Sequence, residues 1–344
     1  MDAAKGIGII LVILGHAFRD EMRIESVFCE FAYLSIYFFH MALFFAISGL
    51  AFGMSYRKYL KTPILFIKRK VQSQIIPVIS YATAIYVCFF VAFQIPFIRQ
   101  ALSATGYQMH SYLKYLGLTA LWDNPYSVHL WYLWVLFIAT VTVFLYFRSV
   151  SDNLRTKLCL IAIALVLYML RSFLMLPYVL LRLFEYSIYF AGGVLLSAKM
   201  ELLLHKSKIL DTVSVLSCLC MLVYCAFSAM QINMGIIDQP QVRACWKLVV
   251  TVFIILGVLR LSCKLENCKP LLYCGRETYS IYLLHQPFCC GFVGVILYNK
   301  LNLPALPVYL ICCALSILLP AVFVAVCRQI KPIGKISKTL LNIT

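Results

Sequence analysis

The sequence predicts an all-α integral membrane protein that crosses the bilayer about ten times. Of its 344 residues, 63% are hydrophobic and only 12% are charged, whereas a soluble domain carries about 25% charged residues. The mean hydropathy is +0.91. Apolar runs of about 20 residues, the length that a helix needs to cross a bilayer, follow one another along most of the chain. These observations exclude an ordinary water-soluble domain.

Ten segments have the length and hydropathy of a spanning helix. In chain order they are residues 3–19, 31–54, 71–94, 127–147, 157–176, 178–198, 209–230, 246–262, 279–298 and 304–327. The fifth and sixth are separated only by Leu176-Pro177, so one broken pair of spans is an alternative there. The spans leave no room for a separate soluble domain, and we interpret residues 1–344 as one transmembrane domain. No internal repeat marks a duplicated architecture.

Basic residues gather at one set of span ends. The chain has 30 Lys and Arg residues against 13 Asp and Glu, a formal net charge of +17. If the N-terminus is cytoplasmic, the inner span ends carry about three times as many of these cations as the outer ends. This asymmetry places both termini in the cytoplasm and explains the basic charge without a nucleic-acid partner. Asn342-Ile343-Thr344 matches a glycosylation sequon, but this orientation keeps it in the cytoplasm, so it carries no weight.

The densest basic cluster lies between the second and third spans. Its members are Arg57, Lys58, Lys61, Lys68, Arg69 and Lys70. Composition alone favours a membrane anchor that touches anionic headgroups. The alternative is a phosphate site, because several cations at a membrane mouth suit a multiply charged nucleotide carrier.

Lys5 and His16 lie on the first span and are the leading candidates for chemistry. They are eleven residues apart, about three helical turns, so they share one face about 16 Å apart. Gly8 and Gly15 lie on the same face, where small residues let a helix or a ligand approach closely. Imidazole has an ordinary pKa of about 6.5, which suits a general base. Asp20, one turn further, either holds the histidine tautomer or is solvated at the surface; a hydrogen bond between helices is the alternative role for His16.

Other polar side chains within the spans are costly in lipid and therefore functional candidates. His40 in the second span is a candidate to contact the substrate or to support His16. Arg182 and Glu185 are spaced i, i+3, so a self-neutralising ion pair is the favoured interpretation. The alternative is that Glu185 binds a hydroxylated acceptor or orients His16.

Two further groups combine aromatic residues with histidine. His129 and Trp131 begin the fourth span, where an interfacial aromatic belt is favoured and stacking of a sugar ring on Trp131 is the alternative. His285 lies two residues before Pro287, which kinks a helix and frees a carbonyl next to a cavity or another helix. A structural hydrogen bond is the favoured role for His285, and contact with substrate is the alternative.

The cysteines predict no metal site. The chain has 15 of them, but most lie within apolar stretches, and neither CxxC pairs nor Cys/His ligand spacings occur. We interpret them as small apolar residues that fill space between helices.

Five motifs occur in order between residues 2 and 287. They are residues 2–16, which end in His16; the Phe-rich segment 39–49, which closes in Ser48-Gly49; Lys68-Arg69-Lys70 followed by Ile76-Pro77; residues 129–133; and residues 280–285. This ordered set resembles acyltransferase family 3, a family of integral membrane proteins with ten spans. Within the family it resembles the branch of fucose 4-O-acetylase and related acetyltransferases.

The resemblance implies transfer of an acyl group, usually acetyl, from cytoplasmic acyl-CoA to a hydroxyl of a sugar in a cell-surface polysaccharide or glycolipid. His16 matches the essential histidine of the family, Lys5 the basic residue of its first motif, and Arg69 the basic residue associated with acyl-CoA. Lys5 stands where many members have Arg, which keeps the charge but removes bidentate phosphate binding.

These observations combine into one hypothesis. Acetyl-CoA binds at Lys5, Lys68, Arg69 and Lys70, and His16 acts as a base or as an acyl carrier. The acceptor contacts are expected at His40, Trp131, Glu185 and His285. The alternative function is a transporter or flippase for a glycolipid or small solute, although such proteins commonly contain paired repeats. The acceptor sugar and the choice between acetyl and succinyl donors stay open.

Overall fold

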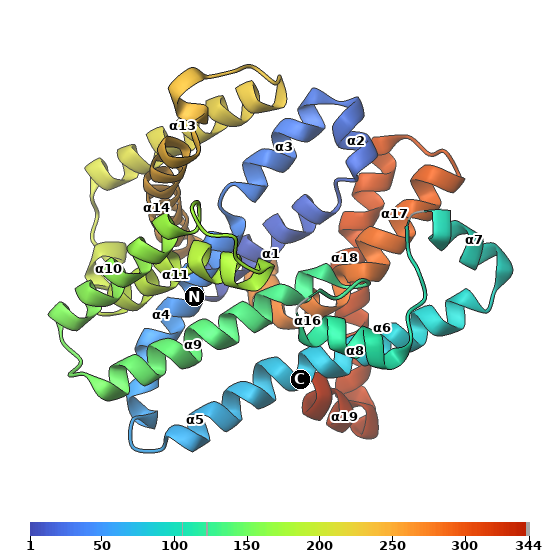
Figure 1. The fold of residues 1–344 in the computed structure, drawn as a ribbon, viewed down its shortest axis with the longest axis horizontal. Coiled ribbons are helices and arrows are strands. Elements are labelled where there is room, and N and C mark those ends of the chain that lie inside the picture. The colour runs from blue at the N-terminus through green and yellow to red at the C-terminus, as the bar shows by residue number, and fades with distance from the viewer. Residues whose placement is uncertain (105, 122, 342–344) are drawn as a thin grey trace.

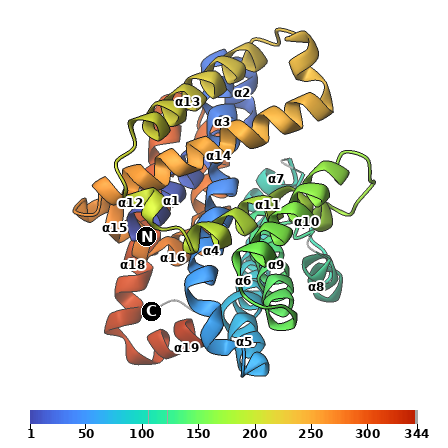
Figure 2. The same ribbon diagram turned by 90° about the vertical axis from the view of Figure 1, so that its left-hand side faces the viewer.

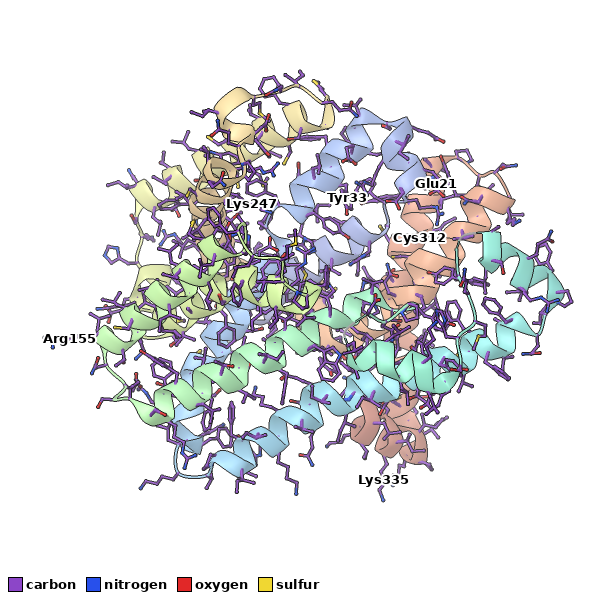
Figure 3. All side chains as sticks on the ribbon, viewed as in Figure 1. Glu21, Tyr33, Arg155, Lys247, Cys312 and Lys335 are labelled. Atoms are coloured by element: carbon purple, nitrogen blue, oxygen red, sulfur yellow. The ribbon has the colours of Figure 1, made fainter. Side chains whose placement is uncertain are left out.

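The computed structural model describes residues 1–104, 106–121 and 123–341, so the sequon at 342–344 lies outside the described residues. The described part is built of helices and contains no strand, which confirms the all-α prediction. Figure 2 shows α2, α3, α13 and α14 gathered at one end of the molecule and α5 and α19 at the other. Arg155 and Lys335 project from the periphery, where their charges avoid the apolar interior (Figure 3).

The α-helices are α1 (Asp2–His16), α2 (Asp20–Glu25), α3 (Val27–Tyr37), α4 (His40–Ser55), α5 (Pro63–Lys70), α6 (Ile76–Phe93), α7 (Pro96–Ala104), α8 (Tyr112–Ala120), α9 (Trp131–Ser149), α10 (Leu154–Leu170), α11 (Tyr178–Ser197), α12 (Glu201–Leu204), α13 (Lys208–Ala229), α14 (Pro240–Lys264), α15 (Lys269–Arg276), α16 (Thr278–Leu284), α17 (Val293–Val295), α18 (Ala305–Gln329) and α19 (Lys331–Leu341). Short 3-10 helices are η1 (Tyr56–Tyr59), η3 (Val128–Leu130) and η4 (Gly235–Asp238). Short π-helices are η2 (Val71–Ile75), η5 (His285–Phe292) and η6 (Ile296–Lys300).

Eight helical stretches of the described chain are long and apolar enough to cross a membrane. They coincide with eight of the ten predicted spans. The predicted spans 3–19 and 157–176 fold as α1 and α10, which have 15 and 17 residues and fall short of the usual 20. The chain turns directly after His16 and directly after Leu170, before the next helix begins. The predicted span 31–54 is divided between α3 and α4.

The pair α4 and α11 approaches most closely through glycines. A Cβ on Gly49 would lie 2.0 Å from the carbonyl oxygen of Phe190, and one on Gly193 would lie 2.1 Å from that of Ala46. Gly53, one turn beyond Gly49, faces the side chain of Ser197, whose Oγ would lie 2.1 Å from an added Cβ. The spacing of Gly49 and Gly53 is the small-xxx-small pattern by which membrane helices pack backbone to backbone. Glycine is therefore required at these positions because no side chain fits between the helices.

Helix α1 is held in the same manner along its whole length. A Cβ on Gly275 of α15 would lie 1.8 Å from the carbonyl oxygen of Asp2, so α15 crosses directly over the first turn of α1. Added Cβ atoms on Gly8 and Gly15 would each lie 2.9 Å from the rings of Phe44 and Tyr37. The expected close approach at these two glycines is therefore confirmed, and it is made by aromatic side chains.

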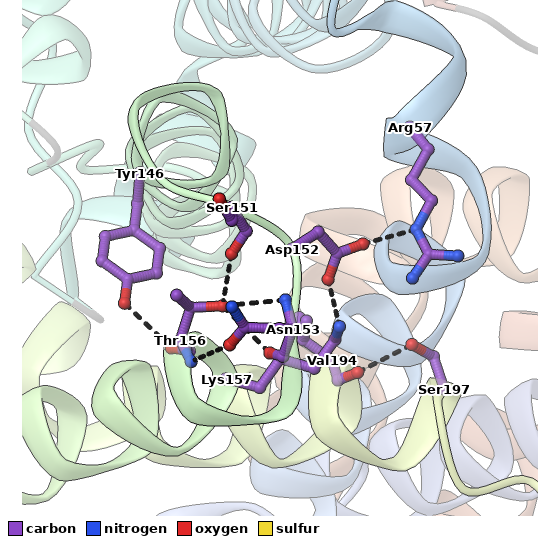
Figure 4. Close-up of polar contacts among 9 residues, drawn as sticks. All are labelled: Arg57, Tyr146, Ser151, Asp152, Asn153, Thr156, Lys157, Val194 and Ser197. Carbon is purple, nitrogen blue, oxygen red and sulfur yellow. Dashed lines mark hydrogen bonds and ion pairs between the residues drawn. The ribbon is translucent and has the colours of Figure 1, made fainter.

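An ion-pair network ties the end of α4 to the connection between α9 and α10 (Figure 4). The Asp152 carboxylate accepts hydrogen bonds from Arg57, at 2.5 Å, and from Lys157. Lys157 is 5% exposed, so its charge needs this partner. Asn153 and Thr156 form a capping box that starts α10 next to the network. Arg57, a member of the basic cluster, therefore has a structural contact that joins two connections between helices.

Burial of the Asp152 carboxyl would by itself raise its pKa, but the hydrogen bonds from Lys157 and Arg57 and the charge of Lys157 outweigh that effect. Together these groups hold the pKa of Asp152 at about 2, below its ordinary value of 3.8. The folded protein therefore favours the ionised carboxylate.

Gly193→Ala should lower the thermal unfolding midpoint of the detergent-solubilised protein by about 5 °C, because the methyl group forces α4 and α11 apart. The neighbouring Gly192 faces open space, so Gly192→Ala is the matched control. It should leave the midpoint unchanged or raise it slightly through helix propensity. Equal effects of the two substitutions would contradict the close crossing.

The Asp152 network should lose its stabilising effect in acid. Since the folded pKa is about 2 and the ordinary pKa is 3.8, this contribution is present above about pH 4 and declines as the pH falls toward 2. The difference in unfolding midpoint between the wild type and Asp152→Asn should therefore shrink between pH 6 and about pH 3. A difference that stays constant over this range would show that the ionised carboxylate is unimportant.

Candidate active site

A cavity of about 320 Å³ lies inside the helix bundle and brings Lys5 and His16 together on one wall. Its lining also includes Ser48 of α4, Trp131 of α9 and Arg276 of α15. Val12 lines it between Lys5 and His16, so one face of α1 borders the cavity over about three turns. We call it the Lys5–His16 cavity. The predicted shared face of Lys5 and His16 is thereby confirmed.

His16 ends α1 and is held by an aromatic hydroxyl. Its Nδ1 lies 3.3 Å from the hydroxyl of Tyr37, and the two rings meet edge to face. Asp20 does not play the tautomer-holding role considered for it. Because α1 ends at His16, the chain turns before α2 begins, and the Asp20 side chain, 86% exposed, bonds to Arg23. Tyr37 therefore occupies the position that the sequence suggested for Asp20.

The rings of His16 and His129, which line the cavity, both pack against the ring of His285. The centroid of His285 is 5.3 Å from that of His16 and 5.3 Å from that of His129. His285 is fully buried, and its Nδ1 lies 3.0 Å from the carbonyl oxygen of Ile281 and 2.8 Å from that of Tyr282. Since carbonyls only accept, Nδ1 carries a proton, and Nε2 has no hydrogen-bond partner among the described residues.

These contacts bear out the structural hydrogen bond favoured for His285. The residue lies against His16, while the cavity wall itself carries His16 and His129. His129 had been grouped with interfacial aromatics, yet it is buried and lines the cavity. Its carbonyl oxygen accepts a hydrogen bond from the hydroxyl of Tyr282, which fixes the start of α9 against α16.

Three other predicted residues have different surroundings. Trp131 lines the cavity and stacks on Tyr186, with ring centroids 5.7 Å apart. Glu185 accepts a hydrogen bond from Arg182 at 2.7 Å, so the self-neutralising ion pair is confirmed. His40 is 2% exposed, and its Nδ1 lies 2.9 Å from the carbonyl oxygen of Ile36. Neither Glu185 nor His40 is among the residues that line the Lys5–His16 cavity.

Lys68, Arg69 and Lys70 form the last turn of α5 and lie outside the cavity lining. Lys68 and Arg69 are exposed, and Arg69 donates a hydrogen bond to the hydroxyl of Tyr59 at 2.5 Å. The π-helix η2, which follows directly, supplies Ser73 and Gln74 to the cavity wall. The three cations are therefore close to the cavity in the chain but do not form its wall.

Two residues that sequence reasoning did not single out complete the lining. Arg276 comes to the cavity because α15 packs on the first turn of α1, and the sequence shows it only as one inner cation among many. The buried Oε1 of Gln74 has no hydrogen-bond partner among the described residues. An unpaired buried acceptor next to a cavity is available to a ligand that donates a hydrogen bond.

The described polar side chains at this site are not arranged as metal ligands. Within the described ranges, no group of three or more His, Cys, Asp or Glu side chains is placed to hold a metal ion. Lys5 is half-buried, and its ammonium group lies 3.5 Å from the carboxylate of Asp2 in a partly solvated ion pair of small energetic weight. The cavity thus offers cations near the start of α1 and imidazoles at its end.

The fold and the site define an α-helical membrane protein whose helices enclose ionisable groups suited to proton transfer and anion binding. A family model described as an acyltransferase domain, that of acyltransferase family 3, matches residues 1–325. The chain belongs to this family and is a membrane acyltransferase. No curated protein and no solved structure matches the chain.

Proposed function

We propose that this enzyme transfers an acetyl group from acetyl-CoA to a hydroxyl of a sugar in a polysaccharide or glycolipid. The single observation that carries the proposal is one cavity lined by Lys5 and Arg276 near the start of α1 and by His16 at its end. Family membership supplies the reaction class. The resemblance to the fucose 4-O-acetylase branch favours a sugar hydroxyl as acceptor and acetyl as the transferred group.

The donor is held by its phosphates. Lys5 and Arg276 bind them at the cavity wall, where a partly desolvated cation interacts more strongly than one in water. Lys68, Arg69 and Lys70, outside the lining, raise the local concentration of the anionic donor by long-range attraction. The thioester then extends along the face of α1 that carries Val12.

His16 performs the proton transfer. In the first route, its imidazole takes the proton of the acceptor hydroxyl while the oxygen attacks the thioester carbonyl. The carbon–sulfur bond breaks, an ester forms, and the thiolate of CoA leaves and takes up a proton. In the second route, the imidazole nitrogen attacks first, the carbon–sulfur bond breaks, and CoA leaves as the thiolate. The hydroxyl oxygen then takes the acetyl group from the acetyl-histidine, its proton passes to the thiolate, and the neutral imidazole is restored. In both routes the hydrogen bond with Tyr37 orients the ring.

The orientation follows from charge. We place the protein in the cell membrane, with both termini and the Lys5 end of α1 on the cytoplasmic side, because Lys and Arg residues favour inner span ends. The acetyl group is then transferred toward the outer leaflet while CoA stays on the cytoplasmic side.

The alternative function, a transporter, lacks the support of the family match. Measurements of acetyl transfer by the wild type and by variants test it.

His16→Ala should lower acetyl transfer at least about 100-fold, since removal of a general base commonly costs that much. The assay follows labelled acetyl from acetyl-CoA into the glycan fraction of membranes that contain equal amounts of wild type or variant. His205→Ala is the matched control, because His205 is exposed and does not line the Lys5–His16 cavity. Full transfer by His16→Ala would overturn its assigned role.

Lys5→Gln should raise the KM for acetyl-CoA about tenfold, because one charge-assisted contact at the cavity wall is lost. Lys5→Arg should keep the KM at or below that of the wild type, since Arg adds bidentate binding. Lys68→Gln, an exposed cation outside the lining, should change the KM less than about threefold, with an effect that salt abolishes. A larger effect at Lys68 than at Lys5 would relocate the phosphate site to α5.

A further inference from the structure

A second cavity, of about 670 Å³, lies among α3, α13, the start of α14 and the end of α10. Its lining includes Glu30, Tyr37, Arg171, Arg243 and Lys247. Figure 2 shows α14 running from this region to α15, which crosses the first turn of α1. The second cavity therefore lies at the opposite end of the bundle from Lys5. Lys247 and Tyr33, labelled in Figure 3, lie in this part of the molecule.

The cations of the second cavity lack carboxylate partners. Within the described residues, Arg243 and Lys247 form no ion pair, and the Nη1 of Arg171 bonds to the carbonyl oxygen of Tyr168. Glu30, the carboxylate on the wall, is already bonded to Arg23 at 2.7 Å. Glu185, which also acts electrostatically on Lys247, is bonded to Arg182. The wall therefore presents three positive charges whose nearby negative charges are neutralised elsewhere.

Aromatic rings form another part of the lining. Tyr224 borders the second cavity and packs on Trp246, with ring centroids 4.8 Å apart. Phe38 borders it as well and lies under the ammonium group of Lys247, at 5.4 Å. A wall of aromatic faces and cations is chemically suited to a hydroxylated ring that carries an acidic group, because the rings bind its apolar face and the cations its charge.

Tyr37 joins the second cavity to the proposed reaction centre. It borders this cavity, and its hydroxyl lies 3.3 Å from Nδ1 of His16, which lines the other one. A hydroxylated molecule in the second cavity is thus separated from the imidazole by one aromatic side chain. The donor and the acceptor can reach His16 from opposite ends of the bundle.

We propose that the second cavity binds the acceptor and selects for an anionic sugar, one that carries a carboxylate or a phosphate group. Lys247, Arg243 and Arg171 bind the acidic group, and Tyr37 directs a hydroxyl of the same molecule toward His16. The inference rests on the proposed function, and it names the class of acceptor. A phospholipid headgroup offers the same anionic chemistry, but the contact between Tyr37 and His16 favours the substrate.

The test uses purified protein and three probes at equal ionic strength: sodium glucuronate, glucose 6-phosphate and glucose. The two acidic sugars should raise the thermal unfolding midpoint, whereas glucose should not. With labelled acetyl-CoA, glucuronate should be acetylated with a kcat/KM at least about tenfold above that of glucose. Equal kcat/KM values for glucuronate and glucose would overturn the selection for an anion.

Lys247→Gln and Arg243→Gln should each raise the KM for glucuronate about tenfold and leave the stabilisation by acetyl-CoA unchanged. Arg243 is exposed, so its variant keeps the test valid if Lys247→Gln folds poorly. Lys300→Gln is the matched control, since Lys300 is exposed and borders neither cavity. Unchanged KM values for glucuronate in both cavity variants would show that Lys247 and Arg243 do not bind the acceptor.

A lipid comparison separates the two sources of the anion. Nanodiscs of phosphatidylcholine alone are compared with nanodiscs that also contain phosphatidylglycerol. Suppose that phosphatidylglycerol raises the unfolding midpoint of the wild type but not of Lys247→Gln, and that glucuronate changes neither midpoint. The second cavity then holds a lipid headgroup, and the inference is overturned. A different result would reject the proposed function and keep the anionic-sugar site. In it, glucuronate raises the unfolding midpoint of the wild type but not of Lys247→Gln, while acetyl-CoA neither raises the midpoint nor donates its acetyl group.

Discussion

The packing of α1 through its glycines is the contact on which the rest of the site depends. Gly6 and Gly275 let α1 and α15 cross with no side chain between them, since added Cβ atoms would lie within about 2 Å of carbonyl oxygens. Gly8 and Gly15 receive the rings of Phe44 and Tyr37. Because these contacts fix the position and rotation of α1, they also fix where Lys5 and His16 point. The same crossing brings Arg276 to the cavity.

The ionisable groups of the interior divide into two kinds. Glu185 with Arg182 and Asp152 with Lys157 neutralise each other through direct hydrogen bonds. Such pairs make burial tolerable, because an unpaired charge in a medium of low dielectric constant is expensive. The cations on the cavity walls are different, since they face open volume and Arg243 has no carboxylate partner in the described chain. In our proposals, an anionic donor or acceptor supplies the missing negative charge.

His16 and Tyr37 form a direct contact between the walls of the two cavities. Its ring lines the Lys5–His16 cavity, and its Nδ1 faces Tyr37, which borders the second one. A transferase that takes its donor from one side of a membrane and its acceptor from the other needs such a position. The catalytic group then stays in place while only the acyl group crosses. The ring of His285 packs against the imidazole of His16, and the ring of His129 packs in turn against His285.

The sequence alone determined the helical membrane class, eight of the spans and the shared face of Lys5 and His16, because hydropathy, helix length and helical periodicity are local properties of the chain. It also indicated the Arg182–Glu185 pair, whose partners are one turn apart. Only the tertiary structure decided that Tyr37 rather than Asp20 contacts His16. It also decided that Arg276 lines the Lys5–His16 cavity while the three cations at the end of α5 do not. The second cavity, too, became visible only in the tertiary structure. These features join side chains from different helices, and they depend on how closely and at what rotation the helices pack, which no local pattern specifies.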